Sequence, residues 1–494
     1  MVKKNIIANF LGSAWVGLIA LLFIPSYIAL MGAEAFALIG LFIAFTNLLA
    51  ALDFGISPTL NRELAAASVH HETEKMRNTL RTLEILYIGI IALVIIVLLS
   101  LSFYLADSWL KNNQLSTATV RQSLQLMGVV IALHLLGNFY SAGLSGLQHQ
   151  VQVNIINMIM ATLRYAAVVP LMHFISASPL FFFGWQLLIG LLHVTVVAVI
   201  VWSKIPMLAH RPVFHKEIIR RIWQFSAGVS LVSIIGLLTA HLDRILLSRW
   251  LSLEAFGYYT VASVIAMSIA PRIASPFFAA MYPRFTQYFK QGEVQKIHTL
   301  YHTGSFSLAL LLIPISLFIT VYAPEVLQQW THDAQTVSQA APVLRLLALG
   351  GLFHGMMYIP YALQLAHGET KIALAINLVS FCLALPMMWL LYTLYGSAGI
   401  AFVWLFVMAC AILFGVYSVH LYILEKQYRK WLLYDNGLIL LIVLPFLLAT
   451  RLLFEVNSLT GLGITLAATL ILPAMLIFQS RTQILNILRR HFST

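Results

Sequence analysis

The feature that most constrains this chain is a series of apolar stretches, each about long enough to cross a lipid bilayer. A transmembrane helix takes about 20 apolar residues, and 61% of the 494 residues are hydrophobic while only 9% are charged. A soluble domain carries about 25% charged residues, so this chain lacks the charges that a surface in water requires. The composition predicts an all-α polytopic membrane protein and excludes disordered, collagenous and coiled-coil chains.

The apolar stretches predict about 14 transmembrane helices. Proline residues fall within several of them, which membrane helices tolerate and which marks bends or interruptions. The expected helices cover residues 6–31, 35–58, 82–106, 121–145, 153–176, 179–202, 223–250, 256–282, 300–323, 341–365, 372–395, 398–423, 435–455 and 460–480.

The first apolar stretch has some features of a signal peptide, because Lys3 and Lys4 precede it and small residues follow it around Glu34. Its apolar run is longer than the 7–15 residues of a signal peptide. The sequence Glu-Ala-Phe at 34–36 also recurs at 254–256, between two later apolar stretches where nothing is cleaved. We therefore expect the first segment to stay in the protein as a helix, with the tripeptide in a short outer turn.

The same repeated tripeptide indicates an internal duplication. Six expected helices separate the two copies, so the two halves would insert in the membrane with the same orientation, as a parallel repeat. The expected division is an N-terminal six-helix lobe at 1–210, a pseudo-symmetric C-terminal six-helix lobe at 211–430, and two extra helices with a basic tail at 431–494.

Basic residues are unevenly divided between alternate loops. With the N-terminus in the cytoplasm, 21 of the 29 Lys and Arg residues lie in segments on that side and four lie on the other. The positive-inside rule therefore predicts that both termini are cytoplasmic. Contact of the basic loops with anionic lipid explains the net charge of +12 better than nucleic-acid binding does.

Four arginines fall within expected helices, where a central charge costs about 2.5–3.5 kcal/mol on insertion scales. Arg164 and Arg272 would lie near the middle of the bilayer, Arg244 about two turns from the outer surface, and Arg345 about one turn in, where it could also reach the interface. Together they predict a cationic cavity. Because the guanidinium fork matches phosphate oxygens, the expected ligand is an anion such as a lipid-linked pyrophosphate.

Other polar side chains occur within several of the same helices. A single one usually marks a satisfied hydrogen bond between helices, but several of them, from both halves, fit a hydrophilic cavity better. The expected lining residues are His134, Asn138, Asn157, Gln186, His193 and His354.

Only two acids are clearly within the expected helices. Asp53 is expected either to contact Arg62 at a helix end or to act in gating. Asp243 is expected either to neutralise an arginine or to carry a coupling ion; it need not pair with Arg244, because adjacent side chains on a helix diverge.

No metal site and no cofactor are expected. The two cysteines lie within apolar stretches, and adjacent histidines such as His70 and His71 point apart on a helix. The sequence also contains no Gly-x-x-x-x-Gly-Lys-Ser/Thr motif, so no ATPase site of that kind is predicted.

Several motifs resemble polysaccharide transporters of the O-antigen flippase (Wzx) type, in the multidrug/oligosaccharidyl-lipid/polysaccharide exporter superfamily. They are NFLGSAW at 9–15, PSYI at 25–28, GAEAF at 32–36, LDFG at 52–55, LDRILLS at 242–248 and EAFGYY at 254–259.

This resemblance implies two lobes that work by alternating access around a cationic cavity. The implied activity is to flip undecaprenyl-pyrophosphate-linked oligosaccharide from the inner to the outer leaflet of the bacterial cytoplasmic membrane. It also implies coupling to H⁺ or Na⁺, with Asp243 and Asp53 as candidate residues, and a glycan polymerase and a chain-length regulator as candidate partners.

Three alternatives stay open. A lipid II flippase is disfavoured because the first helix lacks an Arg-rich opening, and a drug or ion antiporter because such relatives usually have 12 helices. The third is a membrane enzyme, such as a glycan polymerase or a glycosyltransferase. It is disfavoured because no outer loop is long and no Asp-x-Asp motif occurs, so we expect a transporter and not an enzyme.

Overall fold

In the part of the chain that the computed structural model describes, short loops connect helices, and the β structure is a single isolated bridge between Lys111 and Ser252. Ten of the described helices are long and apolar enough to cross a membrane, and two shorter apolar helices cover Leu11–Leu22 and Leu459–Ile471. The prediction of an all-α polytopic membrane protein is therefore confirmed. The structure describes residues 2–69, 71–208, 212–215, 241–369, 371–454, 456, 458–471 and 475.

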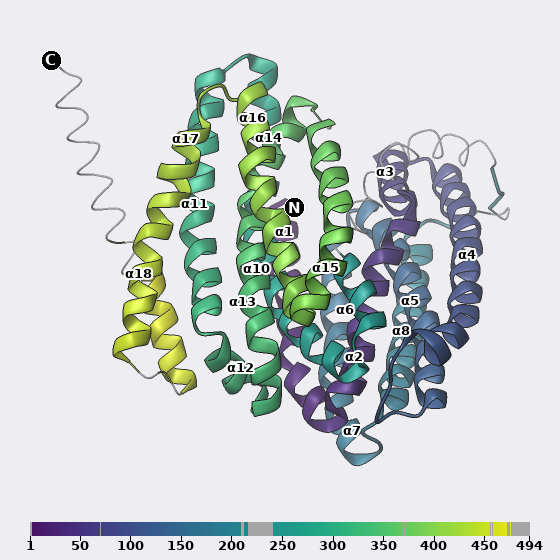
Figure 1. The fold of residues 1–494 in the computed structure, drawn as a ribbon. Coiled ribbons are helices and arrows are strands. Elements are labelled where there is room, and N and C mark those ends of the chain that lie inside the picture. Colours follow the sequence, from purple (N-terminus) through teal and green to yellow (C-terminus); the bar gives the residue numbers. More distant parts are fainter. Residues whose placement is uncertain are drawn as a thin grey trace. The chain divides into compact units, whose positions relative to one another are not determined.

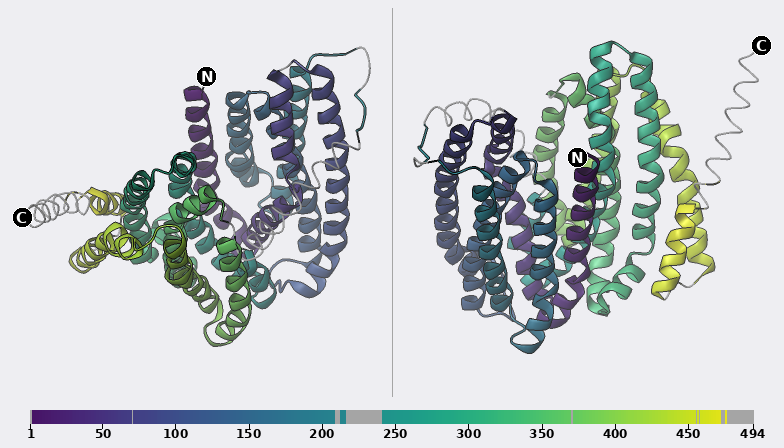
Figure 2. Two further views of the ribbon diagram at one scale, coloured as in Figure 1. Left: turned by 90° about the horizontal axis from the view of Figure 1, so that it is seen from above. Right: turned by 180° about the vertical axis from the view of Figure 1, so that it is seen from behind.

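The chain forms two compact units, residues 1–257 and 258–494. In the first unit, α5 is the central helix and packs against α8, α4 and α3 (Figures 1 and 2). The elements of this unit are α1 (Val2–Leu22), α2 (Ile24–Leu49), η1 (Ala50–Asp53), α3 (Ile56–Val69), α4 (Thr73–Tyr104), η2 (Leu105–Trp109), α5 (Thr117–Gly146), α6 (Gln150–Ala161), η3 (Thr162–Ala166), α7 (Val168–Phe174) and α8 (Pro179–Lys204).

In the second unit, α11 packs against α13 on one side and α18 on another (Figure 1), and the buried core is built around it. The element α10 (Leu253–Gln291) begins in the first unit and continues into the second. It is followed by α11 (Val294–Val321), α12 (Ala323–Thr331), α13 (Ala334–Met356), α14 (Tyr358–His367), α15 (Lys371–Cys410), η4 (Ala411–Val416), α16 (Tyr417–Tyr422), α17 (Tyr428–Lys430), η5 (Trp431–Gly437) and α18 (Leu438–Leu453).

Two glycines divide long helices at places where the sequence predicts separate ones. Gly32 has φ +82° within α2, and Gly396 has φ +60° within α15. Residues with a side chain rarely adopt these positive φ values. The expected helices 6–31 and 35–58 therefore meet at Gly32, and those at 372–395 and 398–423 meet at Gly396.

Some expectations fall partly outside the described residues. Of the expected helix 223–250, the structure describes 241–250, which is helical, and of the expected helix 460–480 it describes mainly 460–471. His70 and the basic tail also lie outside the described residues. The expected lobes at 1–210, 211–430 and 431–494 stay a prediction.

Both copies of the repeated tripeptide lie in the first unit. The buried Glu34 carboxylate accepts hydrogen bonds from the backbone N–H groups of Asn113 (2.8 Å) and Gln114 (2.7 Å), and so holds the loop before α5. At the second copy, Gly257 lies so close to the Ala33 carbonyl oxygen that a Cβ would overlap it. The segments that flank the two copies are therefore in contact at Ala33 and Gly257.

The loop before α5 also binds the chain just before the second copy. The carbonyl oxygen of Lys111 accepts from the Leu253 N–H group (2.8 Å), and Lys111 Nζ donates to the Trp250 carbonyl oxygen (3.0 Å). The Trp109 indole donates to Ser248 Oγ (3.0 Å). These contacts fix residues 248–257 to the first unit.

Candidate functional site

The half-buried Arg164 lies in the π-helical turn η3, which interrupts the expected helix 153–176. Its Nη2 atom is 3.1 Å from His193 Nδ1, and its Nε atom is buried without a hydrogen-bond partner. Among the residues that the structure describes, no carboxylate lies within ion-pair distance of Arg164. The guanidinium charge is thus not balanced by an acid.

Three other predicted residues lie close to Arg164. His193 and Gln186, both buried on α8, contact Arg164 directly, because Gln186 Nε2 donates to the Arg164 carbonyl oxygen at 3.1 Å. His134 of α5 interacts electrostatically with Arg164 and His193, and its ring centroid is 5.5 Å from that of Phe42. The structure therefore brings together Arg164, His134, Gln186 and His193, which we call the Arg164 cluster.

Each member of the Arg164 cluster has a buried polar atom without a partner in the described part of the chain. Buried polar atoms without a hydrogen bond are rare in folded proteins. A set of them around one cation can bind a polar ligand that supplies the missing bonds. These atoms are Arg164 Nε, His134 Nε2, His193 Nε2 and Gln186 Oε1.

Side chains from three helices hold the π turn in place. A π turn shifts the helical hydrogen bonds by one residue, and such turns occur frequently at functional sites. Here α1, α2 and α8 each provide at least one donor. The bonds are Trp15 Nε1 to Thr162 Oγ1 (3.0 Å), Trp185 Nε1 to the Leu163 carbonyl (2.8 Å), Gln186 Nε2 to the Arg164 carbonyl (3.1 Å) and Tyr27 Oη to the Tyr165 carbonyl (2.6 Å).

One predicted asparagine lies on the same helix as His134, and the other lies on the helix that precedes η3. Asn138 is exposed on α5, and Asn157 is half-buried on α6. Neither makes a side-chain hydrogen bond to the Arg164 cluster among the described contacts. Their place in a cavity stays a prediction.

Three predicted residues lie in the second unit. Arg272 is exposed on α10 and donates to the Ser268 carbonyl oxygen at 3.4 Å. Arg345 and His354 are half-buried on α13, and the His354 ring lies against Trp404 at 5.9 Å. The convergence of these residues with Arg164 stays a prediction.

Arg244 and Asp243 are both buried in the helical segment 241–250 of the first unit. Arg244 Nη1 is 2.8 Å from Nδ1 of His241, one turn earlier. At the other acidic candidate, Asp53 accepts from the Ser57 N–H group (3.2 Å) and from the Ser57 hydroxyl. Asp53 therefore fixes the start of α3.

Sequence reasoning missed the buried acid Glu84. Glu84 of α4 is only 4% exposed and forms an ion pair with Arg81 at 2.7 Å. It also accepts from Tyr140 Oη (2.6 Å) and Trp202 Nε1 (3.1 Å). Its position inside the expected helix 82–106 was the available signal, but the partners come from α5 and α8 and are visible only in the fold.

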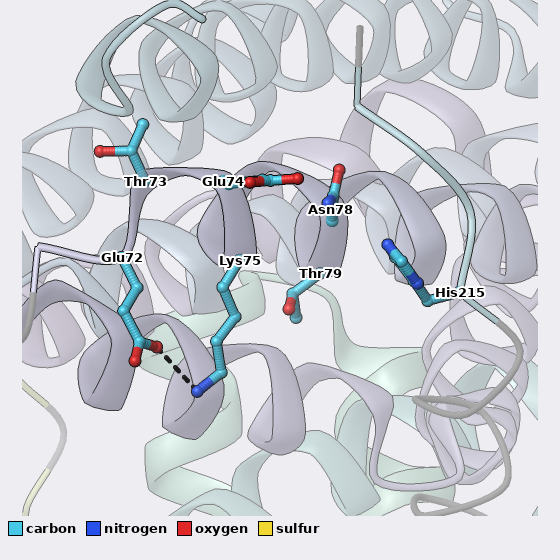
Figure 3. Close-up of a pocket in the computed structure, with 7 residues that line it drawn as sticks. All are labelled: Glu72, Thr73, Glu74, Lys75, Asn78, Thr79 and His215. Atoms are coloured by element: carbon cyan, nitrogen blue, oxygen red, sulfur yellow. Dashed lines mark ion pairs between the residues drawn. The ribbon is translucent and has the colours of Figure 1, made fainter. Parts of the chain in front are cut away.

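A surface pocket of about 560 Å³ lies at the start of α4 (Figure 3). Figure 3 shows the Glu72–Lys75 ion pair (2.8 Å) on one side and His215 on the other. The Val213 N–H group donates to Asn78 Oδ1 at 2.8 Å, which keeps the segment 212–215 against α4. The pocket carries charges of both signs, and none of its lining residues belongs to the Arg164 cluster.

Comparison with protein families identifies the chain. The family described as "Polysaccharide biosynthesis protein" matches residues 2–289, which is more than half of the chain. The chain belongs to the polysaccharide biosynthesis protein family. A second family, MatE, matches residues 228–390. The predicted resemblance to the polysaccharide flippase group of the exporter superfamily is confirmed.

Individual relatives are distant but cover most of the chain. A Shigella flexneri protein named "Putative O-antigen transporter" is 21% identical over 405 residues, which are 81% of this chain and 93% of that protein. The structure of the lipid II flippase MurJ in an inward closed conformation has 13% identity and a TM-score of 0.71, covering 98% of this chain and 99% of that one.

A third relative is an inward-facing multidrug resistance MATE family transporter of the MOP superfamily. It has 15% identity and a TM-score of 0.68, and the match covers 82% of this chain and 96% of that one. At these identities the two solved structures establish the fold alone. The relatives named here are transporters or flippases.

Proposed function

We propose that this protein flips an undecaprenyl-pyrophosphate-linked oligosaccharide from the inner to the outer leaflet of the bacterial cytoplasmic membrane. The observation that carries the proposal is Arg164, a guanidinium within a membrane helix that no described carboxylate neutralises. Family membership and the named O-antigen transporter support a polysaccharide substrate.

The chemistry of the Arg164 cluster suits a diphosphate. A guanidinium can donate two parallel hydrogen bonds to phosphate oxygens, and such charge-assisted bonds are about twice as strong as neutral ones. The imidazoles of His134 and His193 can donate as well. Removal of a cation from water is costly unless a counter-charge is supplied, so a pyrophosphate would stabilise the cluster as it binds.

The proposed mechanism is alternating access by two lobes. The glycan would cross through a hydrated cavity, while the polyprenyl tail would stay in the bilayer. Arg272, Arg244 and Arg345 would add positive charge along the path. Asp243 or Asp53 would exchange H⁺ or Na⁺ during the cycle, and a glycan polymerase with its chain-length regulator would receive the product.

A lipid II flippase is the second candidate. The overlap with the MurJ structure, which covers 98% of this chain, favours it as far as the fold is concerned. Lipid II also carries a pyrophosphate, so the Arg164 cluster would serve either substrate. Deletion of the gene separates the two candidates: an O-antigen-type flippase leaves its lipid-linked repeat unit in the inner leaflet, whereas loss of lipid II flipping stops wall synthesis.

Substitution of the arginines tests the proposal. Arg164→Ala and Arg272→Ala should each reduce surface glycan at least tenfold, because a charged hydrogen bond contributes about 1.5–3 kcal/mol, and Lys should restore part of it. Surface glycan and the amount of inserted protein are measured in a complemented deletion strain. The exposed Arg62→Ala is the matched control. Normal surface glycan in both alanine variants would rule out the anion site.

A further inference from the structure

A second group of buried polar side chains lies within the second unit. His302 of α11 and Asp435 of η5 are 5% and 3% exposed, and Nδ1 of His302 is 2.5 Å from Oδ2 of Asp435. The other ring nitrogen, Nε2, is 2.9 Å from Oε1 of Gln427, just before α17. The fold thus brings His302 together in the core with two polar side chains that lie more than 120 residues later in the sequence.

The two oxygen atoms that face the His302 ring match the hydrogen-bonding pattern of its protonated form. A neutral imidazole has one N–H group and one lone pair, whereas its protonated form has two N–H groups. In this structure both ring nitrogens of His302 face oxygen atoms, one of a carboxylate and one of an amide. An imidazolium fits both contacts, and the Asp435 carboxylate balances its charge.

The same site can also accept the neutral ring. If the proton leaves Nε2, rotation of the Gln427 amide presents an N–H group in place of the oxygen, so the lone pair again has a partner. The Nδ1–H group can donate to Asp435 throughout. Both ring nitrogens therefore keep a hydrogen-bond partner whether the proton is bound or released. A buried polar atom without a partner would be costly.

Other ionisable groups surround the pair. His298 and Tyr301 come from α11 itself, and His420 comes from α16. From α17, Lys430 acts electrostatically on His298, and the Tyr428 ring contacts that of His420 at 5.5 Å. Asp435 is the acid that the His302 imidazole contacts directly.

Next to this pair, His420 and Trp431 each have a buried atom without a hydrogen-bond partner among the described residues. His420 Nδ1 is 2.8 Å from the Val416 carbonyl oxygen and donates to it, which leaves Nε2 as an acceptor. The indole N–H of Trp431, a fully buried residue, is a donor without a partner. The polar surroundings of the pair therefore extend to α16 and η5.

We propose that His302, Asp435 and Gln427 form a buried proton-binding site, and that the bound proton holds residues 427–437 against α11. The site is separate from the proposed transport of a lipid-linked substrate, since proton binding requires no substrate. It also differs from the predicted coupling acids Asp243 and Asp53. Its position next to the predicted cytoplasmic loop before α17 would expose it to cytoplasmic pH.

Nitrogen NMR of ¹⁵N-histidine-labelled protein in lipid nanodiscs tests proton binding directly. The His302 signals are assigned by their loss in His302→Gln. At one and the same pH, we expect both ring nitrogens to carry protons in the unsubstituted protein and only one to do so in Asp435→Asn. A ring with a single proton from pH 5 to pH 9, unchanged by Asp435→Asn, would overturn the proposal.

A second variant keeps the test informative if Asp435→Asn fails to fold. Gln427→Met removes the acceptor at Nε2 without altering the ion pair, and should give the singly protonated ring as well. His332→Gln, at an exposed residue after α12, is the control and should leave the His302 signals unchanged. Retention of both protons in Gln427→Met would exclude Gln427 from the site.

Hydrogen exchange tests the structural consequence without any transport assay. At a fixed pH of 7, Asp435→Asn and Gln427→Met should each raise the exchange rate of backbone amides in 427–437 at least tenfold over the unsubstituted protein. Amides of α5, in the first unit, serve as the internal reference. Equal protection of 427–437 in all three proteins would show that the proton does not hold this segment.

Discussion

At the scale of residues, the buried acids and the half-buried Arg164 differ in their partners. Glu34 accepts two short backbone hydrogen bonds, Glu84 pairs with Arg81 and two further donors, and Asp435 pairs with His302. These bonds reduce the cost of burying a charge. Arg164 has no such acid among the described residues, and this difference is why we propose that it binds a ligand.

The close approach of Gly257 to one backbone oxygen atom predicts the effect of a substitution at this residue. A Cβ at this position would overlap the Ala33 carbonyl oxygen, and forced contacts of this kind typically cost about 1–3 kcal/mol. Gly257→Ala should therefore lower the thermal unfolding temperature in detergent. Gly89→Ala on α4, where a Cβ meets no atom within 4 Å, is the matched control and should be neutral or slightly stabilising. Equal unfolding temperatures for the two variants would contradict the packing argument.

At the scale of elements, interruptions of the helices determine where functional side chains lie. A shift of one residue on a helix turns a side chain by about 100° around the axis. The π turn η3 therefore sets the direction of Arg164, and the donors from α1, α2 and α8 maintain the turn.

The π turn gives a prediction for Trp185. Trp185→Phe keeps an aromatic ring but removes the hydrogen bond to the Leu163 carbonyl oxygen, so Arg164 should lose its fixed direction. We expect surface glycan to fall several-fold while the amount of inserted protein stays constant. Trp389→Phe, at an exposed residue of α15, should have no effect.

A double substitution separates positioning from a general structural effect. If Trp185 acts through Arg164, then Trp185→Phe should cause no further loss in an Arg164→Ala background, since coupled residues are not additive. Additive losses would mean that Trp185 contributes independently of the arginine.

At the scale of the whole molecule, the uneven distribution of basic residues predicts the orientation. In the first unit, Arg77 and Lys204 belong to the same end of the helices, because Arg77 donates to the Pro206 carbonyl oxygen just after α8. Lys111, in the loop before α5, and Glu34 of α2 belong to the other end, where Ala33 and Gly257 are in contact. The first end carries more positive charge and should face the cytoplasm.

Reporter fusions test this orientation. Alkaline phosphatase is active only outside the cytoplasm, so a fusion after Asn113 should be active and a fusion after Lys290 inactive. A green fluorescent protein fused after Thr494 should fluoresce, since the C-terminus is predicted to be cytoplasmic. An active phosphatase after Lys290 would reverse the orientation.

The sequence by itself determined the fold class and most helix positions. Burial of about 20 apolar residues in lipid is a property of each segment alone, so no knowledge of the partners is needed. The breaks at Gly32 and Gly396 fall in the gaps between the expected helices 6–31 and 35–58 and between 372–395 and 398–423, and their glycine conformation is known from the structure. Arg164, His134, Gln186 and His193 were identified because a polar residue within an apolar helix stands out against its neighbours.

Only the tertiary structure decided which of these polar residues meet. Arg164 and His193 come together through the packing of α8 beside a π turn, and sequence periodicity assumes a regular α-helix at that place. His302 and Asp435 were not identified, since their pairing joins positions 133 residues apart. Hydrogen bonds act over about 3 Å, and such distances between remote segments are fixed by packing and not by local preference.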